Sequence, residues 1–305
     1  MLLSLCATLA FSCSIVSARR AASAFGSLAA NFLRLALATL LLALYAHVFG
    51  YGISGPSLSL FFVSGIIGFG LGDVALFLSV SRIGPRLTIL LTQTLAAPFA
   101  AVIEWIWLGT RLSAAQMLCG GVILCGTALA VSAPRQHLDI STQRRQTFGL
   151  FCGVLSALGQ GCGAVVSRKA FAVAETVHFP IDGITAAYQR ILGGVLVAGI
   201  FWLTVATVRG RTRLHLSGMR SSVSVLKDRS ALWVLSNALC GPVIGVSFFQ
   251  WALKTTPSGI VLPIVATTPI VAMPLTYWLD GDRPSRLAVI GALIAVGGVI
   301  GLMRV

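Results

Sequence analysis

The chain has 305 residues, of which 57% are hydrophobic and only 10% are charged, and its mean hydropathy is +0.93. A soluble domain of this length would be about one quarter charged, so these few charges could not cover a soluble core. The formal net charge of +14 would suit a nucleic-acid-binding protein, but the basic residues lie between apolar blocks and form no recognition helix, so we do not expect a nucleic-acid partner.

The apolar residues fall in blocks of about 20, the length that an α-helix needs to cross a hydrocarbon layer about 30 Å thick. Because these blocks are continuous rather than alternating, they exclude a transmembrane barrel. We predict an all-α membrane protein with ten transmembrane helices, multi-pass in a bacterial inner or plasma membrane. In chain order the predicted spans are 2–18, 28–49, 58–80, 87–108, 114–132, 148–167, 183–208, 231–252, 259–279 and 286–303.

The first span has an alternative interpretation. Val16-Ser-Ala18 could end a cleaved signal peptide. No basic region precedes the apolar stretch, however, and the stretch has a repeat partner at 148–167. We therefore expect the first span to be retained as a transmembrane helix.

The chain is an internal duplication. Gly70–Val131 reads again at Gly241–Leu302 with a constant offset of 171 residues, and upstream segments match with offsets of 156 and 149. We divide the chain into a first repeat (1–133), a polar linker (134–147) and a second repeat (148–305). Five spans per repeat is an odd number, so the second repeat enters the membrane from the opposite side, which predicts two inverted five-helix repeats.

Basic residues are distributed unevenly between the two sides of the predicted bundle. Loops after the odd-numbered spans contain 15 Arg and Lys residues, whereas the other loops and the termini contain five. Positive-inside reasoning places the odd loops in the cytoplasm and both termini outside.

Spans three to five contain Gly70-Leu-Gly-Asp73, Ser81-Arg-Ile-Gly84, a mid-span Pro98 and Trp107-Leu-Gly109, and Arg34 lies early in span two. In this order the pattern resembles the EamA domain of the drug/metabolite transporter superfamily, in two consecutive copies. One departure is Thr110-Arg111, where the family usually has an acidic residue. Family members are also drawn with both termini in the cytoplasm, which conflicts with the charge count, so the orientation stays open.

Ionisable residues within a bilayer are costly and are therefore candidates for function. Asp73 lies among glycines in span three, and its repeat partner at the 171-residue offset is the apolar Ile244. We interpret Asp73 as a proton- or cation-coupling site or a ligand for an ammonium group, with a purely structural acid as the alternative. Arg34 and Arg190 occupy equivalent positions early in spans two and seven. They either extend toward the membrane surface, or act as gates that bind an anionic solute or pair with acids as the cavity opens to either side.

Several uncharged residues complete the candidate set. The amides Gln93, Gln160, Asn237 and Gln250 lie at mid-depth in spans four, six and eight, and are consistent with a shared central cavity. Pro98 and Pro269 hold matching mid-span positions, and Pro263 adds a second break to span nine; these prolines predict kinked helices along a pathway. Glu104, beside Trp105 and Trp107, is expected to reach headgroups and water, and its replacement by Gln to cost little.

Secondary transport is the leading hypothesis for function. The sequence contains no G-x-x-x-x-G-K-[ST] motif for ATP. We expect the substrate to be a small metabolite or drug-like solute, in the first place an amino acid or derivative, moved by alternating access through proton coupling or exchange. The alternatives are an intramembrane enzyme and a non-transporting structural membrane protein. The seven Cys and four His are scattered, so we expect no metal and no cofactor; the other partners are the lipid bilayer and, at most, a second copy in a homodimer.

Overall fold

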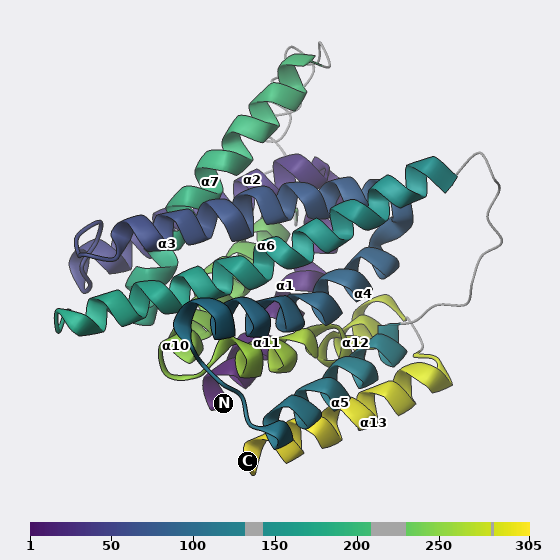
Figure 1. Ribbon diagram of the computed structural model, residues 1–305. Helices are drawn as coiled ribbons and strands as arrows, with labels where there is room; N and C mark the ends of the chain where they lie inside the picture. The colour runs from purple at the N-terminus through teal and green to yellow at the C-terminus, as the bar shows by residue number, and fades with distance from the viewer. Residues whose placement is uncertain (132–142, 209–229, 282–283) are drawn as a thin grey trace.

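The computed structural model describes residues 1–131, 143–208, 230–281 and 284–305, and every regular element within these ranges is a helix (Figure 1). Ten of the described helices are long and apolar enough to cross a membrane, which confirms the prediction of an all-α protein with ten spans. Most of the predicted linker (134–147) and of the long predicted loop (209–230) lies outside the described residues.

In the first five spans, span three changes from an α-helix to a π-helix and back to an α-helix. The elements are α1 (Leu2–Phe25), α2 (Ser27–Val48), α3 (Leu58–Gly65), the π-helical segment η1 (Ile66–Gly72), α4 (Asp73–Leu108) and α5 (Ala114–Val131). α4 runs from the end of span three through span four and turns at Gly84, where a φ of 80° requires the left-handed conformation that glycine adopts readily.

The second five spans repeat this order. Their elements are α6 (Gln143–Thr176), α7 (Gly183–Val208), α9 (Ser230–Ala238), the π-helical segment η3 (Leu239–Gly245), α10 (Val246–Thr255), α11 (Ser258–Ala266), α12 (Thr268–Asp280) and α13 (Arg286–Met303). π-Helical turns are rare, so their presence in both the third and the eighth span supports the duplication. The inversion of one repeat relative to the other stays a prediction.

Two predicted spans end too early. α1 continues beyond residue 18 to Phe25, and α6 continues beyond residue 167 to Thr176. At both places the apolar block ends at a pair of basic residues, but the backbone stays helical because its hydrogen bonds are internal and long basic side chains can extend toward water.

Glycines allow the helices at the centre to approach closely. A Cβ added to Gly159 would lie 3.1 Å from the Cα of Gly72, and one added to Gly163 would lie 3.2 Å from the Cα of Gly68. The sequence has a Gly-x-x-x-Gly pattern in η1 (Gly68 and Gly72) and another in α6 (Gly159 and Gly163), and these two patterns pack against each other. By contrast, nothing lies within 4 Å of a Cβ added to Gly297.

Span nine is broken between α11 and α12 at Thr267, and Pro269 lies in the first turn of α12. Pro98 and Pro263 lie inside α4 and α11. Thr267 itself satisfies a carbonyl at the break, because its N and Oγ1 both donate to Ile264 O, at 3.1 Å and 2.6 Å. Hydroxyls of α1 pack against the same break: Thr8 Oγ1 lies 3.3 Å from Ile264 O and Ser12 Oγ lies 3.0 Å from Thr268 O. Polar groups of this kind satisfy a broken helix inside a bilayer.

α5 and α13 form a separate pair at one edge of the bundle (Figure 1). Their backbones meet where a Cβ at Gly126 would lie 2.5 Å from Ala295 N and one at Gly291 would lie 2.4 Å from Ala130 N. Neither helix contributes a described residue to the central cavity. This pair therefore packs at the edge of the bundle without lining the site.

Candidate functional site

A cavity of about 250 Å³ lies among the helices of both repeats. Its lining residues come from α1, α2, η1, α4, α6, α7, α10, α11 and α12. This volume is small for a ligand site, which suits a small metabolite better than a large drug-like molecule. The cavity combines aromatic and aliphatic walls with a few polar groups, the composition expected of a solute-binding site.

An ion pair occupies one wall of the cavity. Asp73 is the first residue of α4 after η1, and its Oδ2 lies 3.1 Å from Arg34 Nη2 on α2. Arg34 Nε also donates to Asn31 Oδ1 at 2.9 Å, one turn earlier on the same helix. The Asp73 carboxylate is therefore already engaged by a cation, and Asn31 holds that cation in place.

Arg190 lies on another wall, on α7, and is only 4% exposed. Its guanidinium carbon lies 5.0 Å from the ring centroid of Phe69 and 5.7 Å from that of Phe249. Nη1 donates to Ser167 Oγ over a long 3.4 Å, and Nε has no hydrogen-bond partner among the described residues. Aromatic faces stabilise a buried cation, but they do not supply the opposite charge.

Ser167 connects Arg190 to two further helices. Ser64 Oγ donates to Gly163 O at 2.6 Å, which leaves the Ser167 hydroxyl to donate to Ser64 at 2.8 Å. The oxygen of Ser167 then accepts from Arg190 and, at 3.2 Å, from Gln250 Nε2. This chain of hydrogen bonds fixes the position of the guanidinium from α3, α6 and α10.

The seven predicted polar site residues fall into two groups. Five of them line the cavity together: Arg34, Asp73, Gln93, Gln160 and Arg190. The remaining two do not line it. Gln250 is linked to the lining residue Arg190 through Ser167. Asn237 accepts a 2.8 Å hydrogen bond from Ser14, which lines the cavity, at the contact between α1 and α9.

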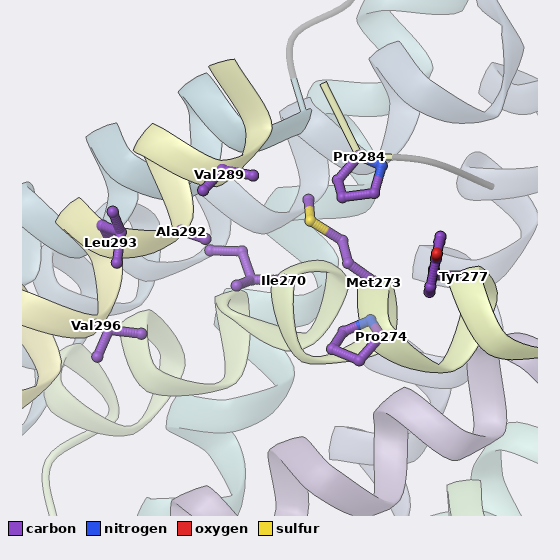
Figure 2. A pocket seen from close by; sticks show the side chains of 9 residues that line it. All are labelled: Ile270, Met273, Pro274, Tyr277, Pro284, Val289, Ala292, Leu293 and Val296. Atoms are coloured by element: carbon purple, nitrogen blue, oxygen red, sulfur yellow. The ribbon is translucent and has the colours of Figure 1, made fainter. Parts of the chain in front are cut away.

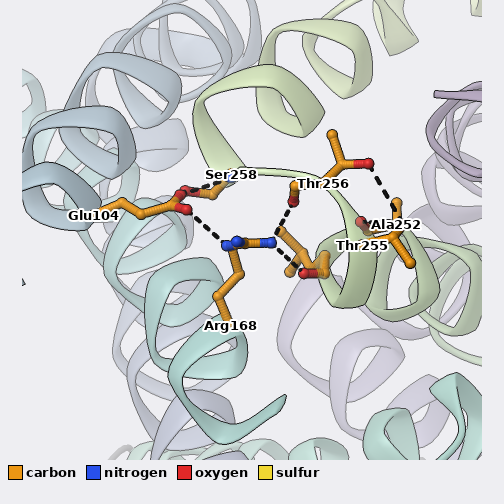
Figure 3. A network of polar contacts seen from close by, with 7 residues as sticks. Glu104, Arg168, Ala252, Thr255, Thr256 and Ser258 are labelled. Carbon is orange, nitrogen blue, oxygen red and sulfur yellow. Dashed lines mark hydrogen bonds and ion pairs between the residues drawn. The ribbon is translucent and has the colours of Figure 1, made fainter. Parts of the chain in front are cut away.

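A second polar network lies away from the cavity, at the end of α4 (Figure 3). Glu104 Oε1 forms a 2.7 Å ion pair with Arg168 Nε on α6, and Glu104 Oε2 accepts from Ser258 N at 2.7 Å and from the Ser258 hydroxyl. Arg168 Nη1 donates to the carbonyls of Leu253 and Thr256, each at 2.7 Å. The network thus joins α4 of the first repeat to α6, α10 and α11 of the second.

The expectation that Glu104 reaches headgroups and water is wrong, because the residue is 2% exposed. Its neighbours Trp105 and Trp107 are exposed. The rotation of the helix places the tryptophans outside and the carboxylate inside, and a linear sequence does not reveal which side faces in.

Sequence reasoning missed the two rings beside Arg190, the hydroxyl of Ser167 and the partner of Glu104. Phe69 and Phe249 are indistinguishable from other apolar residues of their spans, so no signal could have selected them. Arg168 could have been identified as a candidate partner for Glu104, since a basic residue within a helix can pair with a buried acid. The predicted span, however, ended one residue before Arg168.

An apolar groove at the edge of the bundle is not a site for a polar solute. It lies between α12 and α13, and its lining is apolar except for the hydroxyl of Tyr277 (Figure 2). A groove of this kind has no groups that would orient a charged or hydroxylated molecule. Within the described ranges there is also no group of three or more His, Cys, Asp or Glu residues that could hold a metal ion.

Comparison with known proteins agrees with this architecture. The sequence profile of the EamA-like transporter family matches residues 1–132 and 147–304. No curated protein matches the chain at a significant level. A solved structure described only as "Crystal structure of protein" has a TM-score of 0.70 at 14% sequence identity, over 99% of this chain and 96% of that one, and so shares the fold. The chain belongs to the EamA-like transporter family, and it is an integral multi-pass membrane protein whose family transports small solutes.

Proposed function

We propose that this protein is a secondary transporter that carries one small solute at a time through the cavity between its two repeats. The observation that supports this most directly is the convergence of Arg34, Asp73, Gln93, Gln160 and Arg190 on a single cavity. These residues are far apart in the sequence and come from both repeats. Polar groups are costly inside a bilayer, and a binding cavity gives all of them one common use.

The positions of the two arginines suit alternating access. Arg34 lies near the start of α2 and Arg190 near the start of α7, and in inverted repeats these two starts face opposite sides of the membrane. Arg34 is part-exposed, whereas Arg190 is buried. The cavity in this conformation therefore opens toward the side of Arg34.

The Glu104 network supplies the closure of the opposite end. It joins α4 to the end of α10 and the start of α11. Near the same end of the bundle, Lys254 Nζ donates to Ile181 O at 2.8 Å, and Gln189 Nε2 donates to Gly52 O at 3.0 Å. For the cavity to open here, Arg168 has to release Glu104, so the network acts as a gate that holds one of two conformations.

Energy for transport comes from a gradient of the solute or of protons, and Asp73 is the acid placed to couple proton movement to the cavity. Movement of the two repeats against each other then exposes the site to one side at a time. The solute leaves chemically unchanged, which separates this proposal from an intramembrane enzyme.

Counterflow in proteoliposomes tests the proposal. A metabolite library is first screened for compounds that raise the unfolding temperature of the purified protein, and the best compound is then followed as a labelled solute. A carrier takes up label faster when the vesicles are preloaded with unlabelled compound. Equal uptake with and without preloading indicates a channel, and conversion of the compound without flux indicates an enzyme; either result contradicts the proposal.

The variant Gln160→Leu tests whether the solute passes through the cavity, because it removes a lining amide while keeping a side chain of similar size. We expect it to slow counterflow at least tenfold. Thr204→Val, on the exposed face of α7, is the matched control and should transport normally. Equal rates in both variants would place the pathway elsewhere.

A further inference from the structure

The charges that line the cavity do not balance. Among its lining residues the ionisable side chains are Arg34, Asp73 and Arg190. Asp73 is bound at 3.1 Å by Arg34, and Gln93 and Gln160 are neutral. These three side chains together have one positive charge in excess, and Arg190 is the cation that no carboxylate binds directly.

Among the described residues Arg190 has no direct ion pair: Asp73 lies within electrostatic reach of it, but the Asp73 carboxylate is bound by Arg34. The described ion pairs are Arg34 with Asp73 and Arg168 with Glu104. For Arg190 the described contacts are one long hydrogen bond to Ser167 and two aromatic faces, and its Nε is unpaired. A buried charge is costly unless an opposite charge or strong hydrogen bonds compensate it.

The duplication explains how this imbalance arises. Arg34 and Arg190 are equivalent, but only the first repeat supplies an acid. Asp73 is the residue directly after η1, whereas the residue directly after η3 is Val246, and both line the cavity. The counterpart from the constant sequence offset, Ile244, is exposed and lies outside the lining. Either way the second repeat supplies an apolar residue at the position where the first repeat supplies a carboxylate, and the one carboxylate of the cavity is bound directly by Arg34.

We infer that Arg190 binds the anionic group of the transported solute, and that this solute is a small monocarboxylate with an apolar body. The inference rests on the proposed function and specifies its substrate class. One carboxylate would neutralise the excess charge through charge-assisted hydrogen bonds to the guanidinium, and Phe69 and Phe249 provide apolar surface beside it.

The same balance of charge argues against neighbouring substrate classes. A phosphate monoester has a charge of about −1.5 to −2 at neutral pH and would leave the cavity negative. A zwitterionic amino acid brings no net charge, so the excess of one would persist, and its ammonium would have to compete with Arg34 for Asp73. Neutral amides and alcohols leave Arg190 uncompensated.

Matched ligands test the charge requirement without knowledge of the natural solute. The unfolding temperature of the purified protein is measured against 3-phenylpropionate and 3-phenylpropionamide, against butyrate and butyramide, and against phenylalanine as the zwitterion. We expect at least one carboxylate to stabilise the protein saturably, with an affinity at least about tenfold above that of its amide and of phenylalanine. If no carboxylate binds, or if an amide or the zwitterion binds as well, the inference is wrong.

Variants then assign the effect to Arg190. Arg190→Gln should weaken carboxylate binding at least about tenfold, whereas Arg190→Lys, which keeps the charge, should retain part of it. Arg111→Gln makes the same chemical change at an exposed arginine between α4 and α5, away from the cavity, and should leave the binding unchanged. Undiminished carboxylate binding in Arg190→Gln would overturn the assignment, and the comparison of acid with amide in the unmodified protein stands even if that variant does not fold.

Binding and transport can fail separately. Carboxylate binding without counterflow would refute the transporter and leave the anion site intact. Counterflow of a neutral or cationic solute that needs no Arg190 would refute the anion site and leave the transporter intact.

Discussion

Glu104→Gln is the most informative single change outside the cavity. The substitution keeps the size of the side chain and one oxygen that can accept from Ser258, but it removes the charge that Arg168 pairs with. Removal of one partner from a buried ion pair costs about 3–5 kcal/mol, because the other charge is left uncompensated. Glu104 is 2% exposed and forms a 2.7 Å ion pair with Arg168, whose side chain is 19% exposed. The partial exposure of Arg168 and the hydrogen bond retained with Ser258 place the expected loss near the lower end, about 3 kcal/mol.

The assay is the free energy of unfolding from SDS titration in mixed micelles. Glu175→Gln is the matched control: it is the same chemical change at an exposed acid of α6, for which we expect a change within about 0.5 kcal/mol. The double variant Glu104→Gln with Arg168→Gln should be more stable than the sum of the single effects predicts, by at least about 1 kcal/mol.

A loss below about 1 kcal/mol together with additive single effects would refute the reasoning. It would mean that water or another group compensates Arg168 when Glu104 is neutral. The gate proposed for this end of the bundle would then lose its basis, because a contact that adds little stability cannot hold one conformation against another.

Three further predictions follow. Asp73→Asn should abolish accumulation driven by a pH gradient and spare exchange, because exchange requires no net proton movement; unchanged pH-driven uptake in a well-folded variant would make Asp73 a structural acid. Gly65→Ala should destabilise the protein by about 1–3 kcal/mol, since a Cβ there would lie 1.7 Å from Arg190 O, whereas Gly297→Ala, with nothing within 4 Å, should be tolerated; thermal unfolding compares the two. A cysteine at Ser221 in a cysteine-free background should resist an impermeant reagent added from outside, as the basic-residue count predicts, and ready labelling would reverse the orientation.

Much of the fold was predictable because the bilayer imposes strong constraints on a sequence. Continuous apolar blocks determine the number of spans, and the duplication appears as a constant offset. The ends of spans were harder to predict, since α1 and α6 continue past basic pairs where the hydropathy falls but the backbone hydrogen bonds do not change.

The sequence predicted which charged residues line the candidate site, but not which of them pair with each other. Arg34, Asp73 and Arg190 stand out because charge inside a membrane is costly. Which of the two arginines pairs with Asp73, the acid of the cavity, depends on the rotation of each helix about its axis. That rotation depends in turn on two π-helical segments, which change the helical register. The inward position of Glu104 depends on the same rotation, and for that reason the sequence placed it in water.

The π-helical segments also make the site sensitive to chain length. A π-helical turn accommodates one extra residue in a helix. In an α-helix each residue rotates the chain by about 100° around the helix axis. Deletion of a single residue between Gly68 and Gly72 would let the span return to an uninterrupted α-helix, but it would also rotate Gly72 and Asp73 together relative to Gly68, which contacts α6. The contact of Gly68 and the ion pair of Asp73 could not then both be kept, so the length of this segment, and not only its amino acids, determines whether the cavity has its carboxylate.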